Sequence, residues 1–177
     1  MAASQQMYPA SYIGADVSSA FPEGFTVRPM EKGDFAKGFL KCLEDLTFMG
    51  NVTEDEFNER WDEIYNGGKG PYYYVVLEFE GRIVGTGIVV AEKKFIHNRA
   101  VVGHIEEVCI AKQHQGKGLG LLMMRALNSV AESAGCTKTI LNCSQEKEKF
   151  YEKCGYTESG MEMVHYITDF RTPPHTP

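Results

Sequence analysis

The sequence predicts an α/β fold of the α+β kind, in which helices flank a central, twisted, mixed β-sheet. Segments with strand and helix periodicity follow one another in the approximate order βααβββαβαβ. Residues 72–92 are rich in β-branched and aromatic residues around a Glu80-Gly81 turn, which is typical of an antiparallel hairpin. Residues 104–143 read as strand, loop, helix and strand, and a right-handed crossover of this kind joins parallel strands.

The first half of the chain predicts one strand and two helices. A strand over residues 25–30 leads to Asp34, which can cap a helix. The apolar face of this helix comprises Phe35, Phe39, Leu43 and Leu46. Thr53 and Glu56 form a capping box for the second helix. The apolar positions that follow are Phe57, Trp61, Ile64 and Tyr65.

The second half predicts the rest of the sheet and two further helices. The hairpin is followed by a strand over residues 100–110. Residues 118–134 carry apolar side chains at i, i+3, i+4 and i+7, so they predict an amphipathic helix that Gly135 ends. The remaining expected elements are a strand at 138–143, a short helix at 145–154 and a last strand within 161–167.

Length and composition favour a single domain. A chain of 177 residues lies within the range of about 100–200 residues that one domain commonly spans. We expect a flexible N-terminal tail at 1–24, one folded domain at 25–170, and a proline-rich C-terminal tail at 171–177.

Charge and cysteine content narrow the class of protein. The net charge of −6 disfavours a nucleic-acid partner, and the sequence has neither a secretory leader nor a membrane-length apolar run. The five cysteines are odd in number and lack C-x-x-C spacing, and the histidines show no ligand spacing either. We therefore expect reduced thiols, no metal, no membrane partner and a cytoplasmic location.

A glycine-rich run at residues 115–120 lies between a predicted strand and a predicted helix. Backbone N–H groups at a helix start can bind phosphate, and glycine allows close approach. The spacing matches neither a dinucleotide-binding fingerprint nor a P-loop. It does match Gln/Arg-x-x-Gly-x-Gly/Ala, through Gln115, Gly118 and Gly120. The alternative is a plain helix-entry turn.

Two positions could carry acid–base chemistry. Glu106 and Glu107 interrupt an apolar strand and point to opposite faces unless a bulge intervenes. A partly desolvated carboxylate there could accept a proton from an ammonium substrate. Tyr151, on the short helix near the C-terminus, could protonate a departing thiolate. The structural alternatives are a pair of edge-strand charges for the glutamates and a core aromatic for the tyrosine.

Four linked motifs resemble the GNAT acetyltransferases, and among them the glucosamine-6-phosphate N-acetyltransferase family. They are Gly-His-Ile-Glu-Glu-Val at 103–108, Gln-Gly-Lys-Gly-Leu-Gly at 115–120, Gly135-Cys136, and Phe-Tyr-Glu-Lys-Cys-Gly-Tyr at 150–156. The resemblance spans residues 25–166 and extends to Leu46-Thr47 and to Lys94-Phe95-Ile96-His97.

The resemblance implies that residues 25–170 form an N-acetyltransferase domain with the GNAT fold, and it also implies a reaction. It implies acetyl transfer from acetyl-CoA to the amine of D-glucosamine 6-phosphate by direct attack through a tetrahedral intermediate. The products are N-acetyl-D-glucosamine 6-phosphate, on the route to UDP-N-acetylglucosamine, and CoA. It also implies a homodimer with active sites at the subunit interface.

The resemblance also assigns site residues. The catalytic group would be Glu106 near the amine, Tyr151 at the thiolate, and Asn142. The cofactor would contact Val108, Cys109, Ile110, Gln115, Gly116, Lys117, Gly118, Leu119, Gly120, Leu121 and Tyr151. The aminosugar phosphate would contact Thr47, Lys94, Phe95, Ile96, His97, Glu106, Glu107, Val108 and Asn142.

Three positions depart from the family pattern. Asn142 stands where the family usually has aspartate, so proton removal rests on Glu106, solvent or a backbone carbonyl. Lys147 stands where relatives often carry an asparagine that contacts the cofactor. Val164-His165-Tyr166 stands where relatives place a phosphate-binding arginine, which His165 or Arg171 could replace.

Two other functions fit parts of the pattern. A GNAT enzyme acting on protein lysines or polyamines is favoured by the acidic chain, because such substrates are cationic. Lys94 and His97 argue against it. A non-catalytic acetyl-CoA-binding module would keep the glycine-rich run and tolerate Asn142 and Lys147.

Overall fold

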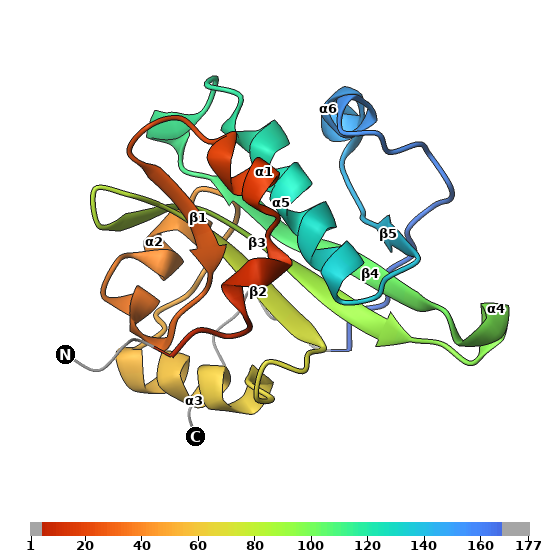
Figure 1. Ribbon diagram of the computed structural model, residues 1–177, viewed down its shortest axis with the longest axis horizontal. Coiled ribbons are helices and arrows are strands. Elements are labelled where there is room, and N and C mark those ends of the chain that lie inside the picture. The colour runs from red at the N-terminus through yellow and green to blue at the C-terminus, as the bar shows by residue number, and fades with distance from the viewer. Residues whose placement is uncertain (1–4, 168–177) are drawn as a thin grey trace.

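The computed structural model describes residues 5–167, which fold around a five-stranded sheet in the order β1-β2-β3-β4-β5 (Figure 1). The strands are β1 (Phe25–Pro29), β2 (Tyr72–Phe79), β3 (Arg82–Lys93), β4 (Val101–Ile110) and β5 (Lys138–Ile140). Neighbouring strands from β1 to β4 are antiparallel, whereas β4 and β5 are parallel. The mixed sheet that the sequence predicts is therefore confirmed.

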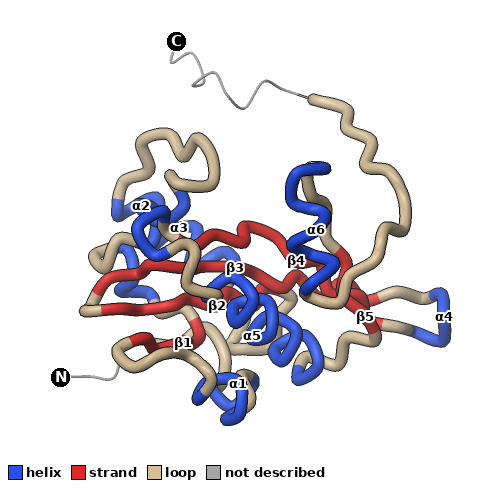
Figure 2. The backbone as a smooth tube through the Cα atoms, turned by 90° about the horizontal axis from the view of Figure 1, so that it is seen from above, coloured by secondary structure: helices blue, strands red, loops and turns tan. Residues whose placement is uncertain are grey.

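Helices cover both faces of the sheet (Figure 2). The α-helices are α1 (Ala15–Ser19), α2 (Phe39–Leu43), α3 (Glu54–Ile64), α4 (Ile96–Arg99), α5 (Leu119–Ser133) and α6 (Glu148–Lys153). Single 3₁₀ turns are η1 (Ala10–Tyr12), η2 (Lys32–Phe35), η3 (Lys112–His114) and η4 (Gln145–Lys147). In Figure 2, α2 and α3 lie on one side of the sheet, and α1 and α5 lie on the other.

The long helix α5 packs closely on β3 because two residues of the strand that lie beneath the helix, Gly85 and Gly87, have no side chain. A Cβ on Gly87 would lie 2.7 Å from Cδ1 of Leu127, and one on Gly85 would lie 3.3 Å from the methyl of Met123. Both helix residues are fully buried. Glycine at these two positions lets the apolar face of α5 approach the sheet backbone.

Several local predictions are confirmed. Thr53 and Glu56 make both bonds of the capping box that begins α3. Glu80 and Gly81 both have positive φ, as a two-residue hairpin turn requires. Gly135 has φ of 80° directly after α5, which is the left-handed conformation that ends helices.

The segment expected as a single helix from Asp34 to Leu46 is divided in two. Asp34 belongs to η2, where Glu31 is the N-cap and Asp34 accepts a hydrogen bond from the Glu31 N–H at 2.8 Å. Gly38, with φ of 85°, separates η2 from α2. The left-handed glycine stops helical propagation, so the prediction of one continuous helix was wrong.

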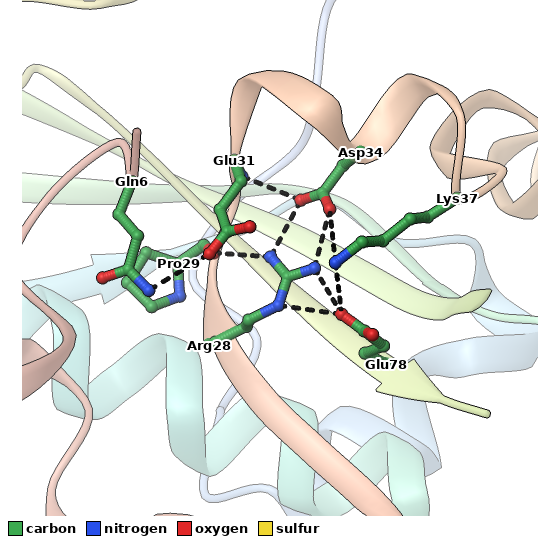
Figure 3. Close-up of polar contacts among 7 residues, drawn as sticks. All are labelled: Gln6, Arg28, Pro29, Glu31, Asp34, Lys37 and Glu78. Carbon is green, nitrogen blue, oxygen red and sulfur yellow. Dashed lines mark hydrogen bonds and ion pairs between the residues drawn. The ribbon is translucent and has the colours of Figure 1, made fainter. Parts of the chain in front are cut away.

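Asp34 also anchors a buried ionic cluster that joins β1, η2 and β2 (Figure 3). Its carboxylate accepts two hydrogen bonds from the Arg28 guanidinium, at 2.7 and 2.9 Å. Arg28 also donates to Glu78, which Lys37 approaches at 2.9 Å. Burial lowers the pKa of Arg28, but Asp34 and Glu78 together raise it further than burial lowers it. These ionic contacts fix the edge of the sheet to the connection that leads into α2.

Residues 5–24 pack on the domain, which corrects the expected N-terminal tail at 1–24 wherever the structure describes it. Met7 and Tyr8 are each 2% exposed, and the Met7 N–H donates to Met30 O at 2.9 Å. Gly14 N–H donates to the hydroxyl of Ser129 on α5. A few apolar residues of this segment, Met7, Tyr8, Ile13 and Phe21, are buried and suffice to hold it on the domain, although they lack any periodicity.

The C-terminal predictions need a second correction. β5 ends at Ile140 rather than at Cys143, and residues 161–167 form no strand within the described chain. Met161, Met163 and Ile167 are more than four-fifths exposed. Strand-like periodicity alone does not place a strand, because hydrogen-bonding partners from a sheet edge are also required. The expected tail at 171–177 lies outside the described residues.

Candidate functional site

The site begins at a β-bulge in the middle of β4. Cys109 pairs with Thr86 and Glu106 pairs with Ile88, so Glu107 and Val108 together oppose the single residue Gly87. Glu107 has φ of 53°, a left-handed conformation that is uncommon outside glycine. The bulge breaks the regular alternation of faces, and both glutamate side chains remain accessible to solvent.

The two glutamates have different electrostatic surroundings. Desolvation raises the pKa of Glu106, with His104 opposing and Glu162 adding to the shift. Desolvation also raises the pKa of Glu107, while a hydrogen bond with Tyr74 opposes the shift. Burial and the Glu107 charge in turn raise the pKa of Tyr74. Glu107 thus forms a hydrogen bond with a phenol. The pKa of Glu106 instead reflects its desolvation and the charges of His104 and Glu162.

β4 and β5 separate next to these glutamates. β5 pairs only with Val102–His104, so no strand of the described chain pairs with the β5 side of β4 from residue 105 to residue 110. Apart from Ile110 O, which accepts a hydrogen bond from the Gln115 side chain, backbone N–H and C=O groups on that side, at alternate residues, are available to a ligand. The Cys109 side chain points elsewhere, since it is buried and its thiol donates to Cys42 O at 3.2 Å. A ligand could therefore meet Cys109 only through its backbone.

The glycine-rich run forms the connection from η3 to the start of α5. Gly116 and Gly118 have φ of 77° and 76°, and nothing in the described structure lies within 4 Å of where their Cβ atoms would be. Gly118 is the N-cap of α5 and makes no side-chain cap bond. The first N–H groups of α5 lack intrahelical acceptors, so they can bind an anion. The arrangement fits a phosphate group.

Two predicted loop residues have structural roles as well. The side-chain amide of Gln115 donates to Ile110 O at 2.8 Å and ties the loop to the end of β4. A Cβ on Gly120 would lie 3.2 Å from the ring of Phe150, so this glycine lets α6 pack on the first turn of α5. Lys117 is exposed, and Leu119 is 1% exposed in the core.

Tyr151 is held on α6 by aromatic and backbone contacts. Its ring centroid lies 5.0 Å from that of Phe150 and 6.1 Å from that of Tyr156. Tyr156 N–H donates to Tyr151 O, and the Tyr156 hydroxyl binds both Asn128 and Thr139. Burial raises the pKa of Tyr151, with smaller increases from neighbours that include Cys143 and Glu106. The phenol therefore stays protonated at neutral pH and can donate a proton or a hydrogen bond.

The remaining predicted residues lie in separate places. Asn142 is exposed in the segment after β5, and Thr47 is exposed in the loop after α2. Lys94-Phe95-Ile96-His97 lies in the β3–β4 connection, which projects beyond the sheet around α4 (Figure 1). Lys94 Nζ lies 2.6 Å from the Glu92 carboxylate. From the start of β4 to Glu106 the strand rises about 17 Å, so one chain does not bring this connection to the bulge.

The structure adds residues that the sequence reasoning did not single out. Asp45 accepts a hydrogen bond from Lys112 N–H at 2.9 Å and pairs with Lys112 Nζ at 3.3 Å. It thereby connects the Thr47 loop to η3, just before the glycine-rich run. Tyr74 contacts Glu107 from β2. Because β3 lies between β2 and β4, the contact of Tyr74 with Glu107 could have been suspected only once the register was known.

Other kinds of site find no support in the described residues. Within residues 5–167, no three histidine, cysteine, aspartate or glutamate side chains are placed to hold a metal ion. None of the described helices is long and apolar enough to cross a membrane.

Known proteins resemble the chain over most of its length. Residues 70–158 match the family model described as an acetyltransferase (GNAT) domain. Glucosamine 6-phosphate N-acetyltransferase of Candida albicans is 39% identical over 81% of this chain and 96% of the relative. That of Dictyostelium discoideum is 36% identical over 89% and 99%. A crystal structure of the Arabidopsis thaliana enzyme superposes with a TM-score of 0.78 at 40% identity, covering 82% of this chain and 100% of that one.

Proposed function

The chain belongs to the glucosamine 6-phosphate N-acetyltransferases of the GNAT superfamily, and we propose that it transfers the acetyl group of acetyl-CoA to the amine of D-glucosamine 6-phosphate. The observation that carries the proposal is the open side of β4, which has Glu106 at one end and the glycine-rich run at the other, with Glu106 close enough for its charge to act on Tyr151. The products are N-acetyl-D-glucosamine 6-phosphate, a precursor of UDP-N-acetylglucosamine, and CoA.

Acetyl-CoA supplies an activated thioester, and the chain offers it two kinds of contact. The N–H groups of Gly116, Gly118 and the first turn of α5 suit the pyrophosphate, with Lys117 adding a positive charge. Backbone groups on the open side of β4, from Val108 to Ile110, suit the amide-rich arm that carries the thioester. This placement directs the thioester along β4 toward the bulge.

The amine must be neutral to attack the thioester carbonyl, and Glu106 is our candidate to accept its proton. Desolvation raises the pKa of this carboxyl, which makes it a stronger base than an ordinary glutamate. Asn142 cannot take up a proton, so its role is to hydrogen-bond the sugar or a water molecule. The neutral amine attacks the thioester carbonyl and forms the tetrahedral intermediate. Collapse of this intermediate breaks the carbon–sulfur bond and expels the CoA thiolate.

Tyr151 is our candidate partner for that thiolate. Its raised pKa keeps the hydroxyl protonated through neutral pH, so it can donate to the developing negative charge on sulfur. The rings of Phe150 and Tyr156 hold the phenol in place.

We further propose that two copies of the chain form a homodimer that completes the sugar-phosphate site. Lys94 and His97 are suited to a phosphate but lie far along β4 from Glu106 of the same chain. The exposed apolar residues of the projecting connection, Phe95 at 98% and Ile96 at 62%, are suited to a subunit interface. Residues 161–167 lie outside the described sheet and expose Met161, Met163 and Ile167, which suits this segment to contact with a second copy.

We propose the cytoplasm as the compartment. All five cysteines are free thiols in the structure, as expected of a protein in a reducing environment.

The test is release of the CoA thiol with glucosamine 6-phosphate, glucosamine or a lysine peptide as the single acceptor. We expect the phosphorylated sugar to give the largest kcat/KM. A preference for the peptide would refute the proposed substrate and favour a protein lysine acetyltransferase. Tight CoA binding without turnover on any amine would instead favour a non-catalytic acetyl-CoA-binding module.

A further inference from the structure

His114 immediately precedes the glycine-rich run and packs beside the rings of Phe25 and Phe79, which stack on each other with centroids 4.4 Å apart. It ends η3 and is 9% exposed. Its ring centroid lies 5.7 Å from that of Phe25 on β1, with the planes almost perpendicular, and 5.3 Å from that of Phe79 at the end of β2. The His114 N–H donates to Ala111 O at 2.8 Å. The imidazole thus packs on rings from β1 and β2, while the His114 backbone is held to the segment just after β4.

Between His114 and the buried Leu119, the glycine-rich run has few side-chain contacts to hold it. Gly116 and Gly118 have open space where side chains would be, and Gln115 supplies one hydrogen bond to the end of β4. Residues 115–118 are all exposed. The contacts of His114 with Phe25 and Phe79 therefore help to set the direction in which the run leaves η3, and with it the direction of the run's N–H groups.

The surroundings of His114 favour the neutral imidazole. Burial lowers its pKa, Lys117 in the run lowers it further, and Glu80 in the β2–β3 turn raises it by less. The remaining contacts described above, Phe25 and Phe79, are uncharged. Nδ1 is buried and has no hydrogen-bond partner in the described structure. Protonation would therefore create a buried N–H donor without an acceptor, which is costly.

We propose that His114 is a positioning residue for acetyl-CoA binding: as a neutral aromatic anchor beside Phe25 and Phe79, it holds the start of the glycine-rich run against β1 and β2. This inference rests on the proposed function, because the run binds the pyrophosphate only if the chain binds acetyl-CoA. The anchor also makes binding sensitive to acid. Above the ordinary histidine pKa the imidazole is neutral, and as pH falls through its lowered pKa the charged ring is disfavoured, because its buried Nδ1 has no hydrogen-bond acceptor in the described structure.

The experiment measures the Kd of CoA by calorimetry, with no acceptor present, for the wild type and for His114→Phe and His114→Ala. At pH 8 we expect the phenylalanine variant to match the wild type, and the alanine variant to bind about tenfold more weakly because both ring contacts are lost. At pH 5 we expect wild-type binding to be weaker than that of His114→Phe. Comparing the two proteins at each pH cancels titration of the CoA phosphates.

Phe35→Ala is the matched control, because Phe35 also sits in a 3₁₀ turn and packs on one phenyl ring, that of Phe57 at 5.5 Å. It should lower thermal stability and leave the Kd of CoA unchanged. The proposal is overturned if His114→Ala binds CoA like the wild type at pH 8, or if His114→Phe weakens in acid as much as the wild type does. Failure of the sugar as acceptor would leave these CoA measurements intact, so the two proposals fail separately.

Discussion

Replacing Asp34 by alanine tests whether the ionic cluster of Figure 3 stabilises the domain. Asp34 is completely buried and accepts three hydrogen bonds, two from Arg28 and one from the Glu31 N–H. The substitution leaves the guanidinium with Glu78 and Pro29 O as acceptors. Arg28 then keeps its charge in a mostly buried position with half of its carboxylate partners removed.

The structure sets the expected size of the effect. Removing one partner of a buried ion pair costs about 3–5 kcal/mol, and the remaining contact with Glu78 places Asp34→Ala near the lower end, at about 3 kcal/mol. For a chain of this length, 1 kcal/mol lowers Tm by about 2–4 °C, so the variant should melt about 6–12 °C below the wild type.

Thermal and urea unfolding, followed by circular dichroism, measure this change. Asp62→Ala is the control, because Asp62 pairs with Lys32 at the surface, where its side chain is 65% exposed. A surface pair of this kind contributes at most about 1 kcal/mol. Equal effects of the two substitutions would refute the reasoning that burial makes the Asp34 contacts important.

Three further predictions concern catalysis and one concerns pH. Tyr151→Phe should lower kcat about 100-fold and change the Kd of CoA little, because only the thiolate's donor is lost; unchanged kcat would make the phenol structural. Glu106→Gln should lower kcat/KM about 100-fold and remove the acid limb of its pH profile; a retained limb would place the proton acceptor elsewhere. Joint replacement of Lys94 and His97 by alanine should raise the KM of the phosphorylated sugar about tenfold but not that of acetyl-CoA, and an unchanged sugar KM would remove both residues from the phosphate site. Burial raises the pKa of Glu78, but Arg28 and Lys37 lower it below its ordinary value. The ionised Glu78 should therefore stabilise the folded state above about pH 4.5, and this stabilisation should be lost as pH falls further. The unfolding free energy of a Glu78→Gln variant should accordingly depend less on pH in this acidic range than that of the wild type.

The sequence predicts best where a local pattern determines the conformation by itself. The capping box at Thr53, the Glu80-Gly81 turn and Gly135 after α5 are each set by neighbouring residues. The long apolar face of α5 is equally clear, because its period of 3.6 residues repeats over four turns. These elements place the glycine-rich run at the start of α5, which is the part of the candidate site that follows most directly from sequence.

The features that sequence could not place depend on distant parts of the chain. The bulge at Glu107 arises from the register between β3 and β4, and neither strand alone specifies that register. Residues 5–24 are ordered by contacts with α5 and β1 rather than by any periodicity of their own. The strand expected within 161–167 has the right alternation, but the described sheet does not extend to it. The contacts of His114 with two phenylalanine rings, and of Tyr74 with Glu107, likewise become visible only in three dimensions.

The most direct test of the central claim is a competition among acceptors. The protein is incubated with limiting acetyl-CoA and equal concentrations of glucosamine 6-phosphate, glucosamine and a lysine peptide, and mass spectrometry measures the acetylated products. The ratio of products reports the ratio of kcat/KM values directly. We predict N-acetylglucosamine 6-phosphate as the dominant product. Predominant acetylation of the peptide, or equal acetylation of the two sugars, would contradict an enzyme whose site recognises an aminosugar phosphate.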